Sequence, residues 1–500
     1  MKKLKTVLVI FASVLALYLT ALFGCFFFEP AQLPSADLSH AGFAFDMYRQ
    51  FAETANPKLY IRQISAADII TDPDTKLQYL QNTLLVHLTE NSDAAIRSIA
   101  SAGYALTGRI DAMNLVQLTA TDTLSLRDLQ EACSQLYDLP SVDFALPDYF
   151  EVTPESARPS EYEIENTYEN NDQAYALIGF SKNLQSVDYP DAGIAVIDSN
   201  VDSSEYLQMS NYDDYASWLP DQHIYYSSDH AVHVAGIAAS RRNDYMCGLA
   251  PGARVYSYNG INNTLSFWLA SVAKAVSVDR VGAVNVSMCY NTNITLSAGL
   301  EDENALAFIR DEAKLFELCV TSLLDRGFSF NICCAAGNEA NNTAYRDFFG
   351  FFHYGDKPVL SKLDFLHLLD TPEDCATAEN AFFFAGMGGK AGEIVITVGS
   401  CGVTGERSSF SVKNAMILAP GEVITSLVSD PILKFQPMSG TSMAAPFVSG
   451  VCARLHAEWP DLSGAQIRAI LLETAENGVL RVDKALERAQ LNDNIDNNAA

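Results

Sequence analysis

The sequence is short of positive charge and of cysteines spaced for cross-links or metal binding. Lys and Arg together number 32 against 61 Asp and Glu, which gives the 500-residue chain a formal net charge of -29. Nucleic-acid binding needs a surplus of cationic side chains, so this balance argues against a nucleic-acid partner. Ten cysteines are too sparse for a disulfide scaffold, and without a C-x-x-C pair the usual zinc half-site is missing. Because 49% of the residues are hydrophobic, a large buried core is expected.

The N-terminus has the features of an export signal. Three lysines among the first five residues precede an uncharged run over residues 7–28, which is about as long as a helix needs to cross a bilayer core. The positive-inside rule then places the chain after residue 28 outside the cytoplasm. Residues 1–28 fit an uncleaved membrane anchor, a cleaved signal sequence, or a lipid-modified Cys25. We expect an exported protein, either anchored to the cell membrane or secreted.

Changes of composition divide the rest of the chain. Residues 29–79 contain no motif and are treated as a linker. Residues 80–152 alternate short strand-like and helix-like segments, which predicts a small α+β domain. Residues 153–173 are rich in Glu, Asn, Ser and Pro, as linkers are. A long α/β-patterned region over 174–485 follows, and an acidic tail over 486–500 ends the chain.

The long region predicts a doubly wound, mainly parallel α/β sheet, because parallel strands are joined by helical crossovers. Its first run, Gly193–Ile197, is continuously apolar, as a strand buried on both faces must be. In such sheets functional sites form at the carboxyl ends of the strands. Chemistry is therefore expected just after the strand-like runs, which are 193–197, 253–258, 283–288, 328–335, 394–398 and 415–418.

Three side chains suited to nucleophilic catalysis stand at such positions or at the start of a helix. Asp198 follows the run 193–197, His230 begins a helix-like segment, and Ser442 lies in a turn that leads into an apolar helix. A serine at a helix N-terminus meets the positive end of the helix dipole, which favours a developing negative charge. Small residues in both helical segments would allow a close approach that brings Ser442 to His230.

The motifs around these residues, taken together, resemble those of the subtilisin-like serine proteases (subtilases). They are Val-Ile-Asp-Ser at Asp198, His-x-x-His-Val-Ala-Gly at His230, Ala-Ala-Gly-Asn-Glu at Asn338 and Gly-Thr-Ser-Met-Ala-Ala-Pro at Ser442. The chain order Asp, His, Ser is that of subtilisin. The resemblance covers about residues 174–480, and four motifs in the right order are far more specific than any one of them.

The resemblance implies a serine endopeptidase with a subtilisin-like catalytic domain. Ser442 attacks the scissile carbonyl, His230 carries the proton and Asp198 orients the imidazole. The Asn338 amide and the Ser442 N–H hold the oxyanion. The walls of the primary specificity pocket are then expected at Ser287, Met288, Cys289, Ala335, Ala336 and Gly337.

The same resemblance implies a self-processing zymogen. The stretch Leu139–Tyr149 is similar to the end of a subtilase propeptide, so residues 80–152 are expected to be an inhibitory propeptide domain. In the family, that domain covers the active site and leaves its last residues in the substrate groove. Self-cleavage is expected between Tyr149 and Asp172. The partners are then peptide or protein substrates, the chain's own propeptide, and the membrane through the N-terminal segment.

No cofactor or metal is specified. Subtilases often bind structural calcium, but the one imitation of a calcium loop, Asp198–Asp202, lacks the Gly and the terminal Glu. Some positions also depart from the family pattern. Ala231 and Val232 stand where the usual Gly-Thr follows the histidine, Cys289 stands where a Gly often lines the pocket, and residues 340–390 are an insertion.

These departures leave two alternatives open. One is a catalytically silent subtilase fold that binds peptides without cutting them, and the other is an esterase that uses the same triad. The intact Asp198, His230, Asn338 and Ser442 favour the endopeptidase.

Overall fold

The computed structural model describes residues 58–151, 171–211, 229–260, 263–288, 302–338 and 384–499, with short gaps in the first and last ranges, and the strands β13 (Tyr345–Arg346) and β14 (Phe352–His353). Five features named above fall outside these residues: the run 7–28 with Cys25, residues 29–57 of the first expected linker, most of the linker 153–173, Cys289, and most of the insertion 340–390. No helix of the described residues is both long and apolar enough to cross a membrane.

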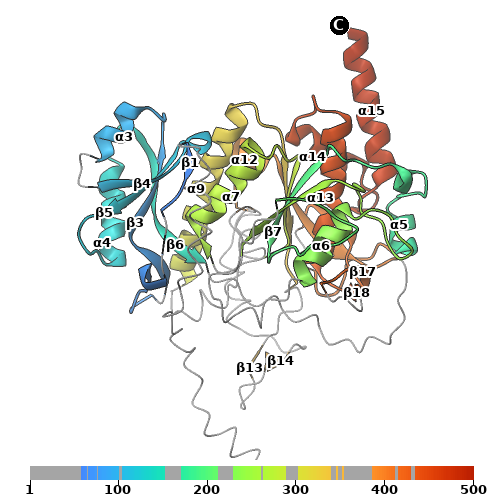
Figure 1. The fold of residues 1–500 in the computed structure, drawn as a ribbon, viewed down its shortest axis with the longest axis horizontal. Helices are drawn as coiled ribbons and strands as arrows, with labels where there is room; N and C mark the ends of the chain where they lie inside the picture. Colours follow the sequence, from blue (N-terminus) through green and yellow to red (C-terminus); the bar gives the residue numbers. More distant parts are fainter. Residues whose placement is uncertain are drawn as a thin grey trace, which may run out of the picture. The chain divides into compact units, whose positions relative to one another are not determined.

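The larger sheet is parallel throughout. Its seven strands lie in the order β16-β15-β12-β11-β7-β9-β8, and each neighbouring pair is parallel. This arrangement confirms the predicted doubly wound α/β fold (Figure 1). The strands are β7 (Gly193–Asp198), β8 (Gln208–Asn211), β9 (Arg254–Asn259), β11 (Ala283–Val286), β12 (Asn331–Ala335), β15 (Val395–Cys401) and β16 (Ile417–Pro420).

Both faces of this sheet are covered, which explains why its strands are apolar at successive positions. Ala195 and Ile197 belong to one hydrophobic core, whereas Ile194 and Val196 belong to another, because successive side chains of a strand point to opposite faces. Helices α7 and α9 share the first core, and α5, α6, α13, α14 and α15 share the second. The helices are α5 (Asp172–Leu177), α6 (Asp229–Ala239), α7 (Leu265–Ser277), α9 (Asp302–Asp325), α12 (Gly389–Gly392), α13 (Thr441–Glu458), α14 (Gly464–Thr474) and α15 (Val482–Ala499).

Local signals start two of these helices. The Thr264 side chain accepts a hydrogen bond from the Phe267 N–H and so caps α7. Ser463 and Gln466 form a reciprocal capping box at the start of α14. A short antiparallel pair, β17 (Ile424–Leu427) and β18 (Phe435–Met438), precedes α13.

The N-terminal region is an antiparallel half-barrel with two helices, in agreement with the expected α+β domain. Its strands lie in the order β1-β4-β5-β3-β6, and β2 pairs with β3. Strands β1 and β2 lie before residue 80, in the range expected to be a linker. The elements are β1 (Leu59–Tyr60), β2 (Ile69–Thr71), β3 (Gln78–Leu88), α3 (Asp93–Ala100), β4 (Tyr104–Ile110), β5 (Leu115–Ala120), α4 (Leu126–Leu136) and β6 (Val142–Glu151).

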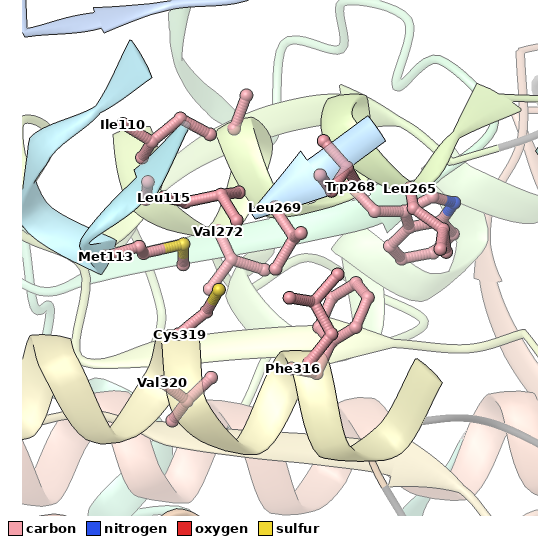
Figure 2. Close-up of a cluster of buried hydrophobic side chains, with 14 of the residues drawn as sticks. Ile110, Met113, Leu115, Leu265, Trp268, Leu269, Val272, Phe316, Cys319 and Val320 are labelled. Atoms are coloured by element: carbon pink, nitrogen blue, oxygen red, sulfur yellow. The ribbon is translucent and has the colours of Figure 1, made fainter. Parts of the chain in front are cut away.

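This region packs on α7 and α9 through a continuous apolar core. Figure 2 shows Met113 and Leu115 of the N-terminal region beside Val272 of α7 and Cys319 of α9. All four side chains are at most 1% exposed. At the end of the region, β6 pairs antiparallel with β10 (Asn263–Thr264), with Glu151 opposite Asn263.

Candidate active site

The site begins with a carboxylate and an imidazole in direct contact. Asp198 is the last residue of β7 and is only 2% exposed, and His230 is the second residue of α6. His230 Nδ1 lies 2.9 Å from Asp198 Oδ1, which also accepts a hydrogen bond from the Ser199 N–H at 2.7 Å. A carboxylate can only accept, so Nδ1 carries the proton and Nε2 is left as the acceptor.

Two opposing effects set the pKa of His230. Burial lowers it, because the charged imidazolium loses hydration, while the nearby Asp198 carboxylate raises it by charge and by the hydrogen bond. The net pKa lies above the ordinary value of 6.5. Asp198 therefore stabilises the protonated form that His230 adopts when it takes up a proton.

Ser442 is held at the neighbouring strand. It is the second residue of α13, and its Oγ donates to the Ser287 carbonyl at 3.1 Å. Ile197 of β7 pairs with Val286 of β11, so Asp198 and Ser287 follow at adjacent places on the carboxyl edge of the sheet. The strand register thus places Ser287, which Ser442 bonds, beside Asp198, which His230 bonds. Within the described site, the Ser442 hydroxyl bonds Ser287 and not His230.

Close packing of α6 against α13 supports this placement. A Cβ on Gly450 would lie 2.8 Å from the Ala238 carbonyl oxygen, so only glycine allows this approach. Ala238 follows His230 by the same number of residues as Gly450 follows Ser442. This is the close helix contact that the small residues predicted.

Asn338 lies just after β12, beside the start of α13. Its Oδ1 accepts from both the Thr441 N–H, at 2.8 Å, and the Thr441 hydroxyl, at 2.9 Å. The amide oxygen is thereby occupied, which leaves Nδ2 as a donor for an oxyanion. Gly337, with a φ of 112°, donates its N–H to Thr441 Oγ1 at 3.2 Å. Sequence reasoning missed Thr441, although it stands in the Gly-Thr-Ser motif that located Ser442.

The expected pocket walls follow two paired strands. Val286 pairs with Cys334, so the segments Ser287–Met288 and Ala335–Gly337 leave the sheet at neighbouring places. Ser287, Ala335 and Ala336 are buried, and Met288 is partly buried. Cys289 lies outside the described residues.

The second histidine of α6, His233, is buried and bonded to the backbone. His233 is fully buried, and its Nε2 lies 3.0 Å from the Gln436 carbonyl oxygen. Burial lowers its pKa to about 3, so it stays neutral. No cluster of His, Cys, Asp and Glu able to hold a metal ion is found in the described ranges.

Comparison with known proteins gives the family. Residues 191–492 match the family model described as Subtilase family (Peptidase S8). Subtilisin E of Bacillus subtilis (strain 168) is 26% identical over 290 residues, which are 56% of this chain and 60% of that protein. Mycosin-1 of Mycolicibacterium smegmatis is 38% identical over 94 residues, or 17% of this chain and 21% of that protein. The chain thus matches about three fifths of subtilisin E and about a fifth of mycosin-1.

A solved structure agrees with the fold. Fervidolysin from Fervidobacterium pennivorans, described as a keratinolytic enzyme related to subtilisin, superposes with a TM-score of 0.50 at 17% identity. The superposition covers 86% of this chain and 65% of fervidolysin. The match of the family model over more than half of the chain confirms the resemblance that the four motifs indicated, and the chain belongs to the subtilase family.

Proposed function

We propose that the chain is a serine endopeptidase that hydrolyses peptide bonds. The observation that carries this proposal is the 2.9 Å contact between His230 Nδ1 and Asp198 Oδ1, with Ser442 held at the adjacent strand end. The reaction needs a nucleophile, a base and donors for the oxyanion. These roles fall to Ser442, His230 and Asn338.

The proposed reaction uses each group at a named atom. Ser442 Oγ turns from the Ser287 carbonyl to His230 Nε2, gives up its proton there and attacks the scissile carbonyl carbon. The oxyanion is held by Asn338 Nδ2 and the Ser442 N–H. His230 then donates the proton to the leaving amine, and water releases the acyl group by the same steps in reverse. Asp198 keeps Nδ1 protonated and stabilises the imidazolium throughout.

The substrate-binding surface is proposed at the two segments that leave the sheet beside Ser442. Ser287, Met288 and Cys289 would form one wall of the primary pocket, and Ala335–Gly337 the other. Extended substrate would add to the edge at Tyr258–Asn263 through main-chain hydrogen bonds.

We propose further that the N-terminal region is an inhibitory propeptide. In support, its last strand, β6, pairs with β10 at the edge where we propose that substrate binds, with Glu151 opposite Asn263. The buried Asp148 carboxylate accepts a hydrogen bond from the Ser266 N–H at 3.0 Å, in the first turn of α7. Self-cleavage is proposed between Tyr149 and Asp172, and residues 1–28 are proposed to export the chain or anchor it to the membrane.

Activity and processing are tested together with one inactive variant. The full-length chain and its Ser442→Ala variant are produced in parallel, and the N-terminus of each product is sequenced. The proposal expects a new N-terminus between residues 149 and 172 in the parent chain and none in the variant. A start outside this range, or processing that persists in Ser442→Ala, contradicts the zymogen.

Assays on peptide and ester substrates distinguish the endopeptidase from the esterase and from the silent peptide-binding fold. The processed parent protein is assayed on a peptide library and on simple esters, with Ser442→Ala as the blank. Cleavage of peptides supports the endopeptidase, and turnover of esters alone supports the esterase. Peptide binding without turnover supports the silent peptide-binding fold, which the Ala231-Val232 departure motivates.

A further inference from the structure

The first turn of α13 contains a backbone acceptor that the helix cannot satisfy. In an α-helix the Ser442 carbonyl would accept from the N–H of residue 446, but that residue is Pro446, which has no N–H. The Ser287 hydroxyl takes the place of the missing donor. Ser287 Oγ donates to the Ser442 carbonyl oxygen at 2.8 Å.

Ser287 also bonds Ser442 in the opposite direction. Its own carbonyl oxygen accepts the Ser442 hydroxyl at 3.1 Å. Two hydrogen bonds therefore join the same two residues, one to the backbone of Ser442 and one to its side chain. The backbone bond fixes where Ser442 lies, and the side-chain bond fixes which way its hydroxyl points.

A buried chain of hydrogen bonds holds the Ser287 hydroxyl in turn. Asn285 Nδ2 donates to Ser287 Oγ at 2.9 Å, and Ser449 Oγ donates to Asn285 Oδ1 at 2.7 Å. Asn285 and Ser449 are fully buried, and Ser287 is 3% exposed. Ser449 lies on α13 two turns after Ser442. The chain of hydrogen bonds therefore starts on α13, passes through Asn285 of β11 and returns to the same helix.

We propose that Ser287 is the positioning residue of the nucleophile, anchored by Asn285 and Ser449. Its side chain fixes the backbone of Ser442, and its carbonyl holds the hydroxyl in a resting orientation from which rotation about one bond brings Oγ to His230. The inference rests on the proposed peptidase function. It adds a role to Ser287, because a hydroxyl has a single proton, and the Ser287 proton is given to the Ser442 carbonyl.

The consequence is a defect in the rate of the chemical step rather than in binding. Without the Ser287 hydroxyl, the Ser442 carbonyl loses its donor and the first turn of α13 is free to shift. The nucleophile and the oxyanion N–H belong to that turn, and a misplacement of about 1 Å costs on the order of 100-fold in rate. An interaction lost only in the transition state lowers kcat and leaves KM unchanged.

A double-mutant cycle tests the proposal. The variants are Ser287→Ala, Ser449→Ala and the double variant, with Ser271→Ala as the matched control. Ser271 is buried in α7, and its hydroxyl has no hydrogen-bond partner among the described residues. Each processed protein is assayed for kcat and KM on one peptide substrate and for the rate of labelling by a fluorophosphonate probe.

We expect Ser287→Ala to lower kcat and the labelling rate by about 10- to 100-fold at unchanged KM. Ser449→Ala should lower kcat less, and the double variant should lose no more than Ser287→Ala alone, because both changes break one chain. Ser271→Ala should match the parent. Additive losses, an increase in KM at constant kcat, or a Ser287→Ala variant equal to Ser271→Ala would each overturn the proposal. If the parent chain itself is not labelled, the peptidase function fails instead.

Discussion

Asp198 and Ser287 occupy adjacent places on the carboxyl edge of the sheet, and each bonds one further side chain of the candidate site. Asp198 bonds His230 at 2.9 Å, and Ser287 bonds the Ser442 hydroxyl at 3.1 Å. Their proximity follows from a single register, Ile197 opposite Val286. The Asp198–His230 pair and the Ser287–Ser442 pair are therefore anchored at the ends of two parallel strands that lie side by side.

Asp198→Asn is expected to reduce kcat by about 10⁴-fold with little change in the fold, because an amide favours the wrong tautomer of His230. The variant should also change the pH profile. Asp198 raises the pKa of His230 above 6.5, and the base must be neutral to act. The acid limb of kcat/KM should therefore lie above pH 6.5 in the parent and move to lower pH in the variant, as measured from pH 4 to 9. An unmoved acid limb would contradict the assignment of His230 as base.

Asn338→Ala is expected to lower kcat by about 100- to 1,000-fold, the usual loss for one oxyanion donor. Thr441→Val should give a smaller loss in the same parameter, because it removes the hydroxyl that bonds Asn338 Oδ1 at 2.9 Å but keeps the Thr441 N–H bond. Thr441→Ser keeps the hydroxyl and serves as the control. Equal rates for Thr441→Val and Thr441→Ser would show that the hydroxyl does not orient the amide.

Asp148→Asn is expected to change how stability depends on pH. Burial raises the pKa of Asp148 from 3.8 to about 6, so the folded chain binds more protons than the unfolded chain between these values. Asp148 therefore lowers stability as the pH rises from about 4 to 6, by about 3 kcal/mol in total. Urea unfolding of Ser442→Ala, with and without Asp148→Asn, measures this contribution as the difference between the two curves. A difference that does not vary with pH would contradict it.

His87 is expected to change the pH dependence of stability in the opposite direction to Asp148. The contribution of Asp148 is therefore measured as a difference between two chains and not from one chain alone. His87 lies 3.1 Å from Asp143 Oδ2 and 3.1 Å from Ser322 Oγ of α9. Burial lowers its pKa below 6.5, against the effect of the Asp143 carboxylate, while Arg326 adds to the lowering. The folded chain then binds fewer protons at this site, so stability falls as the pH drops below about 6.5. His87→Gln in the Ser442→Ala background should reduce that loss.

Val272→Asp is expected to destabilise the contact between the N-terminal region and α7 by at least about 3 kcal/mol, because it buries an unpaired charge. Val272 is fully buried in the cluster of Figure 2. Val278, at the end of the same helix, is 49% exposed, and Val278→Asp is the matched control. Urea unfolding of both variants in the Ser442→Ala background makes the comparison. Similar stabilities would show that the shared core contributes little.

The parts of the fold that could be predicted are those with strong local patterns. The continuous apolar run at Gly193–Ile197 predicted β7 to within one residue, because a strand buried on both faces cannot contain polar residues before its end. Strands β1 and β2 have only two and three residues, too few to show any periodicity. They are defined by pairing with β4 and β3, which local sequence does not reveal.

In the candidate site, too, local motifs could be predicted from the sequence, whereas contacts between distant segments could not. Asp198, His230, Asn338 and Ser442 stand in recognisable motifs. The structure bonds His230 to Asp198 and Ser442 to Ser287, and Asp198 and Ser287 lie at neighbouring strand ends. Contacts between motifs could not be predicted: Thr441 and Asn338 are 103 residues apart in the chain, and Ser287 and Ser442 are 155 apart. The Pro446 that removes a helical donor was visible, but only the fold shows which hydroxyl replaces it.

The most direct test of the account is the rate at which a fluorophosphonate labels Ser442 in the processed protein, compared between the parent and His230→Ala. The account predicts that the label attaches to Ser442 and that loss of the base slows labelling by at least about 100-fold. Labelling at equal rates in both proteins, or none in a parent whose N-terminal region has been removed, would contradict an activated serine at this site.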